Sequence, residues 1–187
     1  MGQPVITPAT YDDLIKVPAN RIAEILNGRL VTQPRPAPKH AWASSALGNK
    51  IGPPFHHGDD NGPGGWIILD EPELHLGEHV LVPDLAGWRR ETLPHLPDTA
   101  YFETAPYWVC EVISPSTARY DRLEKRDIYA AQKISWLWLV EPDRRMLEAF
   151  ELQNGKWTLL ATRANEDEIA LDPFAAVPFS LGVLWPD

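Results

Sequence analysis

The segment 107–114, which reads YWVCEVIS, decides the fold. Its residues are apolar almost without interruption, which is typical of a central strand covered on both faces. The next segment, 114–117 (SPST), ends the strand and caps a helix, which we expect to run from Thr117 or Asp121 to Lys133. A buried strand followed directly by a helix indicates a domain that mixes strands and helices.

Strands and turns continue on both sides of this segment. Downstream, strands are predicted over residues 136–141, 146–152 and 157–162, with turns at Pro142 and at Asn154-Gly155. Upstream, Asn27-Gly28 joins two apolar runs, 22–26 and 29–31, which is the strongest short signal for a hairpin. Further strands are predicted over 66–69 and 79–89. Together these strands are expected to form one strongly twisted sheet.

Two helices and a loop are predicted ahead of the central strand. Thr10 is the expected N-cap of a short helix over residues 10–16. Apolar residues at helical spacing predict a second helix near residues 39–50. Residues 52–65 are crowded with Gly, Pro and polar side chains, so a long mobile loop is expected there. The fold class is therefore α/β (α+β), a twisted mixed β-sheet flanked by helices.

The length and composition fit one domain. The chain has 187 residues, and we expect a single domain over 1–187, with a core at about 11–162 and a Pro-rich apolar segment, 163–187, packed on it. No apolar stretch approaches the ~20 residues needed to cross a bilayer, so no membrane partner is expected. Cys110 is the single cysteine, which excludes an intramolecular disulfide and favours a cytoplasmic location.

The charge restricts how this chain could bind nucleic acid. Acidic residues outnumber basic ones by 26 to 17, a formal net charge of −9. A protein that binds nucleic acid by broad electrostatics needs a basic face, and the chain as a whole lacks that surplus. Any such contact must be local or metal-assisted, and strong binding requires Arg89, Arg90, Lys125 and Arg126 to cluster around the site.

Three acids interrupt apolar strands. Asp84 lies within residues 80–88 (VLVPDLAGW), Glu111 within the central strand, and Glu24 between apolar neighbours of the hairpin. Taken alone, Asp84 or Glu111 could accept hydrogen bonds at a strand end. Because burying a carboxylate is costly unless it is paired or binds a metal, a shared explanation is Mg²⁺ or Mn²⁺ held by Asp84 and Glu111. Glu24 would position the attacking water or a second metal.

Asp121, Lys125 and Tyr129 recur at every fourth position, which places them on one helical face. Lys125 would stabilise negative charge on a phosphate, and Tyr129 would bind the same phosphate or position the lysine. Simpler interpretations stay open. Asp121 and Lys125 form a solvated surface pair, Tyr129 packs in the core, and His40 is a hydrogen-bonding residue at a helix start.

The order of these motifs resembles the Uma2 family of restriction-endonuclease-like proteins, within the PD-(D/E)XK nuclease superfamily. The resemblance spans about residues 11–160 and rests on six segments: 23–31 (AEILNGRLV), 38–40 (PKH), 82–85 (VPDL), 111–117 (EVISPST), 121–129 (DRLEKRDIY) and 138–142 (WLVEP). It implies a single restriction-endonuclease-like domain, with Asp84 and Glu111 as the two motif acids and Glu24 as the acid of the early element.

The lysine of the family pattern is displaced in this chain. In the superfamily a lysine usually stands two residues after the second acid, but that position is Ile113 here. Members resembling this chain supply the lysine from the following helix, which points to Lys125. The resemblance thus implies a Mg²⁺- or Mn²⁺-dependent endonuclease that hydrolyses DNA, with catalytic and supporting residues Glu24, Asp84, Glu111, Lys125, Tyr129, Asp121 and His40.

Two alternatives stay open beside the endonuclease. The first is a non-catalytic interaction or regulatory module that retains the fold, which Ile113 and the negative net charge both favour. The second is a glycosidase-like hydrolase that uses two carboxylates and stacks sugars on Trp side chains. A homodimer is expected for the endonuclease, because cutting both strands of a duplex calls for two sites.

Overall fold

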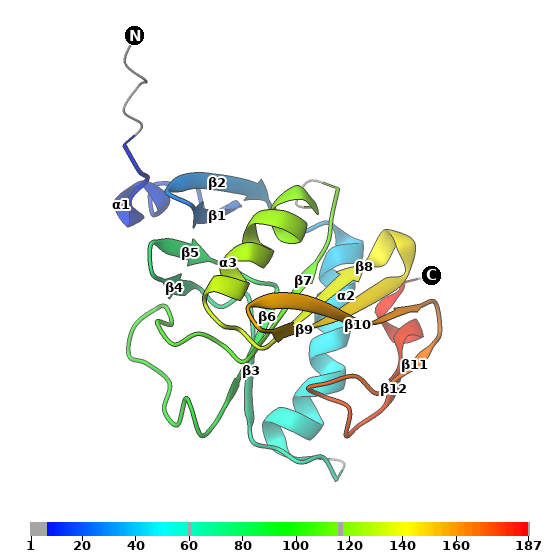
Figure 1. Cartoon of the computed structure of the whole chain (residues 1–187). Helices are drawn as coiled ribbons and strands as arrows, with labels where there is room; N and C mark the ends of the chain where they lie inside the picture. The colour runs from blue at the N-terminus through cyan, green and yellow to red at the C-terminus, as the bar shows by residue number, and fades with distance from the viewer. Residues whose placement is uncertain (1–6, 60, 116–117, 187) are drawn as a thin grey trace.

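The strand at the centre of the sequence is also the centre of the fold. In the computed structural model, which describes residues 7–59, 61–115 and 118–186, β7 (Trp108–Val112) is buried at every position. It lies inside a six-stranded sheet of order β10-β9-β8-β7-β6-β3, parallel to β8 and antiparallel to β6 (Figure 1). The predicted central strand and the mixed α+β class are confirmed, whereas Ser116 and Thr117 lie outside the described residues.

The remaining elements follow one another along the chain as labelled in Figure 1. The helices and helical turns are α1 (Tyr11–Leu14), α2 (Pro38–Ile51), η1 (Gly52–His57), η2 (Tyr120–Lys125), α3 (Arg126–Ala131), η3 (Pro142–Arg144) and η4 (Leu181–Leu184). The strands are β1 (Arg21–Leu26), β2 (Arg29–Pro34), β3 (Trp66–Asp70), β4 (Leu74–Leu76), β5 (His79–Leu81), β6 (Leu85–Arg89), β8 (Trp136–Glu141), β9 (Met146–Gln153), β10 (Lys156–Ala164), β11 (Glu168–Ile169) and β12 (Phe179–Ser180).

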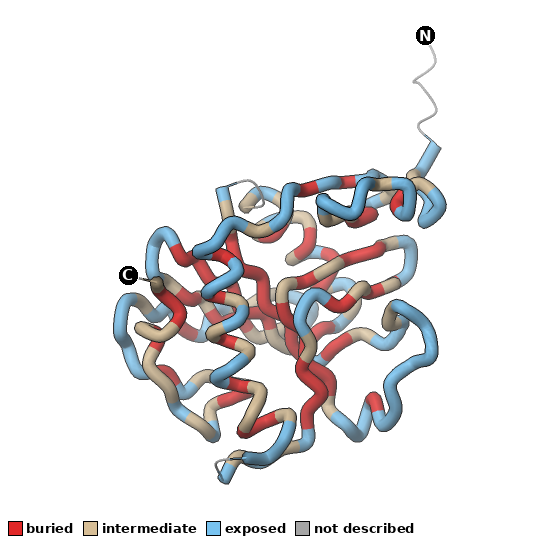
Figure 2. The backbone as a smooth tube through the Cα atoms, turned by 180° about the vertical axis from the view of Figure 1, so that it is seen from behind, coloured by how far each residue is buried: buried red, intermediate tan, exposed pale blue. Residues whose placement is uncertain are grey.

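The large sheet is covered on both faces, and the buried backbone in Figure 2 marks its central strands. Side chains alternate along β7, so Trp108, Cys110 and Val112 join the core under α2 and the C-terminal segment. Val109 joins the opposite core, which contains Ile128 and Tyr129 of α3. Glu111 therefore points from β7 toward the helical face that carries Tyr129.

The prediction of one sheet is wrong, because four strands form a second sheet of order β2-β1-β5-β4. Its hairpin β1–β2 is confirmed, with positive φ at both Asn27 and Gly28. The predicted strand 79–89 is divided into β5 and β6, which belong to different sheets. Pro83 lies in the break, where its missing N–H removes no ladder hydrogen bond. Asp84 consequently lies between two strands and not inside one.

The prediction of a mobile loop over residues 52–65 is wrong for the first half of that segment. Residues Gly52–His57 continue α2 as a wide helical turn, η1, in which Pro54 and Phe55 are buried. Phe55 anchors this turn because its ring packs edge-on against Phe174, with 4.8 Å between ring centroids. The C-terminal segment contributes Phe174 and Trp185, among others, to the same core.

Within the described residues, the helix expected to end at Lys133 is already helical at Ala118 and Arg119, continues through the wide turn η2 and ends with α3 at Ala131. Lys133 has a φ of 59°, outside helical geometry. None of the helices within the described ranges combines the length and hydrophobicity that a bilayer-spanning helix needs.

Candidate active site

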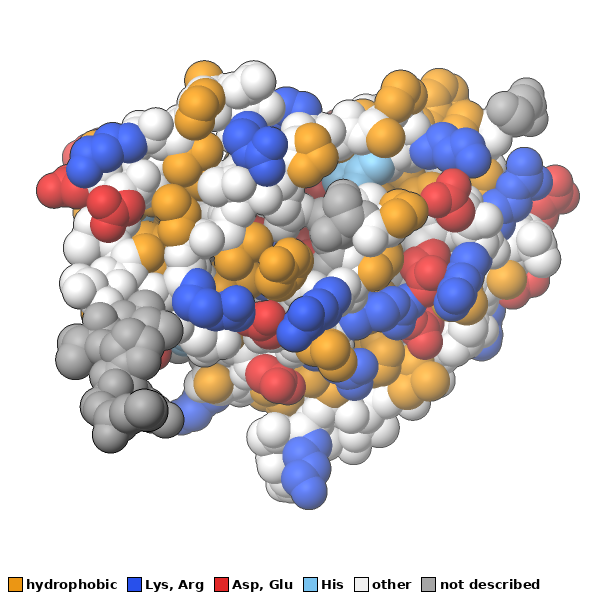
Figure 3. All heavy atoms as spheres, turned by 90° about the horizontal axis from the view of Figure 1, so that it is seen from above, with side chains coloured by type: hydrophobic (Ala, Val, Ile, Leu, Met, Phe, Trp, Pro, Cys, Tyr) orange, Lys and Arg blue, Asp and Glu red, His pale blue; other side chains and the backbone are white. Residues whose placement is uncertain are grey.

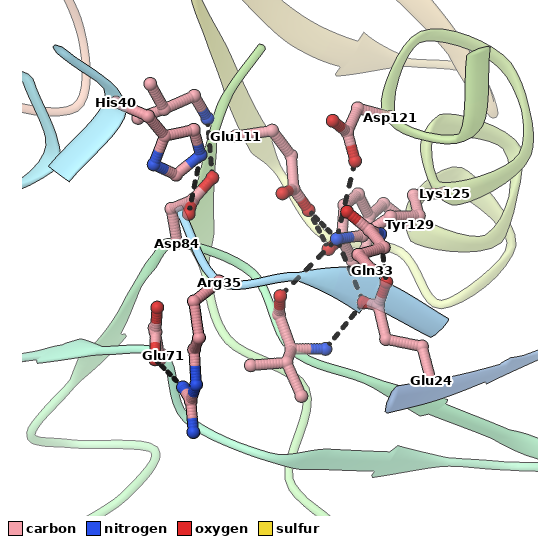
Figure 4. Close-up of polar contacts among 12 residues, drawn as sticks. Glu24, Gln33, Arg35, His40, Glu71, Asp84, Glu111, Asp121, Lys125 and Tyr129 are labelled. Atoms are coloured by element: carbon pink, nitrogen blue, oxygen red, sulfur yellow. Dashed lines mark hydrogen bonds and ion pairs between the residues drawn. The ribbon is translucent and has the colours of Figure 1, made fainter. Parts of the chain in front are cut away.

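Four residues that the sequence singled out converge on one cavity, although they are far apart in the chain. Glu24 comes from β1, Asp84 from the break between β5 and β6, Glu111 from β7 and Lys125 from η2. All four line a cavity of about 120 Å³, and Asp121 and His40 line it too (Figure 4). The site thus forms where the small sheet, the large sheet and the helix after β7 meet.

Lys125 lies at the centre of the acidic side chains. Its Nζ lies 2.8 Å from Oε1 of Glu111, 3.0 Å from Oε1 of Glu24 and 3.6 Å from Oδ1 of Asp121 (Figure 4). Side chains of Lys125 and Asp121 are only 2% and 3% exposed. The interpretation of Asp121 and Lys125 as a solvated surface pair is therefore wrong, because the helix turns this face toward the sheets.

Glu24 is fixed by two hydrogen bonds in addition to its ion pair with Lys125. The backbone N–H of Val82 donates to Oε1 at 2.8 Å, and Nε2 of Gln33 donates to Oε2 at 3.1 Å. The sequence reasoning missed Gln33. The hairpin itself contains the signal: Gln33 comes two residues after the buried Val31 along β2, so the two side chains lie on the same face of the strand.

Asp84 bridges the central strand and helix α2. Its Oδ2 accepts a hydrogen bond of 2.7 Å from the backbone N–H of Val112, and its Oδ1 lies 3.2 Å from Nε2 of His40. Burial alone would lower the pKa of His40, but its hydrogen bond to Asp84 and the negative charge of that carboxylate outweigh burial and raise the pKa. Nδ1 of His40 is buried and has no hydrogen-bond partner among the described residues.

Glu111 is the carboxylate most affected by its surroundings. The hydroxyl of Tyr129 donates to Oε1 of Glu111, and Tyr129 is fully buried. Burial raises the pKa of Glu111 well above its usual value; Lys125 opposes this rise, while Asp121 and other acids add to it. Tyr129 is therefore both a core residue and a hydrogen-bond donor to an acid of the site.

Lys125 keeps its positive charge despite its burial. Desolvation would lower the pKa of a buried ammonium group. The neighbouring carboxylates, Glu111 first and then Glu24, raise the pKa of Lys125 well above the usual value instead. The carboxylates thus favour the charged form of Lys125, which lies beside the two acids of the family pattern.

The site has an excess of acidic groups. Glu24, Asp84, Glu111 and Asp121 line the same cavity, with Lys125 and His40 close to them. Within the described residues, no three His, Cys, Asp or Glu side chains are arranged as a ready metal site. The donors nevertheless fit Mg²⁺ or Mn²⁺ in kind, because these hard cations need only one or two protein carboxylates and complete their shell with water. Asp84 and Glu111 offer those two.

The basic cluster considered from the sequence does not form. The Arg89 guanidinium lies over the Trp66 ring at 4.8 Å, and Arg126 lies over Phe150 at 4.3 Å. Arg90 donates to the backbone oxygen of His56. These three arginines do not line the cavity. On the face shown in Figure 3, basic and acidic side chains are interspersed.

Comparisons with known proteins agree with this architecture. A crystal structure described as a putative nuclease belonging to DUF820, from Anabaena variabilis ATCC 29413, is similar to this chain with a TM-score of 0.70. The two share 20% sequence identity over 95% of this chain and 97% of that one, a likeness that shows the fold alone. No curated protein matches the chain. The family model "Uma2: Putative restriction endonuclease" matches residues 8–183, and the chain therefore belongs to the Uma2 family.

Proposed function

We propose that this protein is a metal-dependent nuclease that hydrolyses a phosphodiester bond of DNA. The observation that carries the proposal is the convergence of Glu24, Asp84, Glu111 and Lys125 on one cavity. Two carboxylates beside a buried, charged lysine match the requirements of phosphodiester hydrolysis, in which negative charge builds up on the phosphate. Family membership supports a nucleic acid as the substrate.

The proposed roles follow from the contacts of each side chain. Asp84 and Glu111 would hold Mg²⁺ or Mn²⁺, which when bound polarises a phosphoryl oxygen and lowers the pKa of a water molecule. Asp84 is oriented for this role by the Val112 N–H. Lys125 presents its ammonium group to the cavity and stabilises negative charge on the phosphate. Glu24, held rigid by its hydrogen bonds, orients the water.

Supporting residues fix the charged ones in place. Tyr129 donates to Oε1 of Glu111, the same oxygen that Lys125 contacts. Asp121 lies 3.6 Å from the ammonium group of Lys125 and adds to its charge stabilisation. His40 holds Oδ1 of Asp84 from the side of α2. Cutting both strands of a duplex with one such site per chain would require two chains, so we propose a homodimer for that reaction.

The proposal is tested by cleavage of a labelled DNA duplex and a labelled single strand with Mg²⁺ or Mn²⁺. Asp84→Asn and Glu111→Gln should each reduce the rate at least about tenfold, since each removes a proposed cation ligand. Asp98→Asn is the matched control, because Asp98 is exposed and outside the cavity. Cleavage that persists in both site variants, or in excess chelator, would contradict the proposal.

One observation favours a second candidate, a non-catalytic module that retains the fold. Glu24, Glu111 and Asp121 already share Lys125 as a counter-ion, so part of the acidic cluster is neutralised without any metal. Calorimetric titration with Mn²⁺ separates the two candidates. The nuclease should bind Mn²⁺ at millimolar concentration or below, with binding weakened in Asp84→Asn; a folded protein that binds none is the non-catalytic module.

A further inference from the structure

The basic side chains that line the catalytic cavity differ in their exposure to solvent. Among the described residues, the cavity lining includes three: Lys125, His40 and Arg35. Lys125 is 2% exposed and is shared by three carboxylates, and His40 is 10% exposed and paired with Asp84. Arg35 has a side chain that is 55% exposed. A ligand arriving from solvent therefore meets Arg35 before it meets the other two.

Arg35 is held in place without being neutralised by a buried acid. It follows the last residue of β2 and stands between Pro34 and Pro36, whose rings restrict the backbone. Its Nη2 donates to the backbone oxygen of Ala19 at 2.9 Å. Its Nη1 lies 3.5 Å from Oε2 of Glu71, in a pair whose two side chains are both well exposed (Figure 4). Exposed ion pairs of this kind contribute little free energy, so an incoming anion can displace Glu71.

The position of Arg35 also links two hollows of the surface. A second cavity, of about 300 Å³, shares Ile22, Arg35 and Val82 with the catalytic cavity. Arg35 therefore lies on the wall common to both. An extended nucleic-acid strand with one phosphodiester in the catalytic cavity would place a neighbouring phosphate beside Arg35.

We propose that Arg35 forms a phosphate-binding site at the mouth of the catalytic cavity, which holds a backbone phosphate of the nucleic acid next to the one that is cleaved. The planar guanidinium group binds a phosphate through two parallel hydrogen bonds. The site would also offset the repulsion between the acidic cavity and a phosphate, because it offers a local positive charge in a chain whose net charge is −9. This inference rests on the proposed function in that the phosphate belongs to the nucleic-acid substrate.

The test is the binding of a short fluorescein-labelled oligonucleotide, single-stranded and duplex, measured by anisotropy at several NaCl concentrations with Ca²⁺ as the hard cation. Arg35→Ala should weaken binding at least about tenfold. It should also lower the slope of log affinity against log salt by about 0.7–0.9, the value of one phosphate contact. Arg163→Ala is the matched control, since Arg163 is exposed on β10 and outside both cavities.

Two further variants separate phosphate binding from loss of charge or of fold. Arg35→Lys keeps the charge but loses the two-pronged geometry, so it should retain the salt slope and lose part of the affinity. Glu71→Gln removes the competing carboxylate and leaves Arg35 in place, so it should bind the oligonucleotide as well as the wild type or more tightly. Circular dichroism should show the wild-type spectrum for every variant, because Arg35 and Glu71 are exposed.

The outcomes distinguish this inference from the proposed function. Equal losses in Arg35→Ala and Arg163→Ala, unchanged binding in Arg35→Ala, or a wild type that binds no oligonucleotide would each overturn the role of Arg35. A wild type that binds through Arg35 but cleaves nothing with any divalent cation would overturn the nuclease and leave the phosphate site standing. Cleavage by the wild type, together with unchanged oligonucleotide binding in Arg35→Ala, would overturn the phosphate site and leave the nuclease standing.

Discussion

The ammonium nitrogen of Lys125 lies 2.8 Å from Oε1 of Glu111, and each of the two side chains is only 2% exposed. The pair is part of a larger cluster, because Glu24 and Asp121 approach the same nitrogen. In a region of low dielectric, one cation then serves as the counter-ion of three acids. The stability of this part of the fold and the proposed chemistry consequently depend on the same side chain.

Replacing Lys125 by Met should destabilise the protein by about 3–5 kcal/mol at neutral pH, because it leaves the buried carboxylates Glu24, Glu111 and Asp121 without their shared counter-ion. Urea unfolding followed by Trp fluorescence measures the change in the free energy of unfolding. Lys156→Met is the control, since Lys156 is exposed at the start of β10, and it should stay within about 0.5 kcal/mol of the wild type. Equal losses in the two variants would show that the cluster does not depend on Lys125.

Replacing Glu111 by Gln should raise the stability of the metal-free protein at neutral pH. Burial first, and the neighbouring acids next, raise the pKa of Glu111 in the folded state. A carboxyl with a raised pKa loses stability as pH rises from its unfolded value through its folded value, because only the folded state resists ionisation. Glutamine resembles the neutral carboxyl and avoids this loss.

The difference between Glu111→Gln and the wild type should therefore be small below the unfolded pKa, about 4.5, and should grow as pH rises toward neutral. Urea unfolding in EDTA at a series of pH values measures it. A variant that is less stable than the wild type at neutral pH would show that the ion pair with Lys125 outweighs the desolvation of Glu111.

Replacing Gly62 by Ala should destabilise the protein by about 1–3 kcal/mol, because overpacking forces the neighbouring backbone to move. A Cβ atom at Gly62 would lie 2.2 Å from the backbone oxygen of Pro54, in the helical turn η1. Gly52→Ala is the matched control, since a Cβ there meets nothing within 4 Å. Thermal unfolding compares the two. An unperturbed Gly62→Ala would mean that this segment is as mobile as its composition suggests.

The parts of the fold that the sequence predicted are those with a local physical cause. Residues 107–114 are apolar on both faces, and only a central strand buries both faces. Asn27 and Gly28 can both adopt positive φ, so the hairpin follows from two residues. In each case residues close together in the sequence determine the backbone conformation, and tertiary contacts then stabilise it.

The errors come from features that depend on distant contacts. The segment 79–89 has the composition of one strand, but Pro83 marks the position where the chain leaves one sheet for another. Residues 52–57 have the composition of a loop, but Phe55 gains a partner in Phe174, more than a hundred residues away. No local pattern contains that contact.

The sequence predicts part of the candidate site, again where a residue stands out from its immediate neighbours. Asp84, Glu111 and Glu24 stand out because a carboxylate in an apolar run needs compensation, and the structure gathers them. Gln33 and Arg35 do not interrupt an apolar run, so their place in the cavity depends on the register of β2 and on how the small sheet meets the large one. That packing is a property of the whole fold.

Replacing Phe174 by Ala tests whether the C-terminal segment belongs to the same cooperative unit as the central sheet. Phe174 is 1% exposed, and its ring contacts four aromatic residues from η1, β3, β7 and β8: Phe55, Trp66, Trp108 and Trp138. Truncating a buried Phe typically costs about 3–5 kcal/mol, which corresponds to a fall in Tm of roughly 10 °C for a chain of this size.

The unfolding of Phe174→Ala should remain a single transition, with Trp fluorescence and far-ultraviolet circular dichroism changing together. Leu160→Ala is the control, because Leu160 is 45% exposed on β10, and it should change Tm by only about 1–2 °C. Two separate transitions, with only one of them shifted by Phe174→Ala, would show that the segment folds independently. One shifted transition means that residues near the C-terminus hold the central strands together, and with them the position of Glu111 on β7.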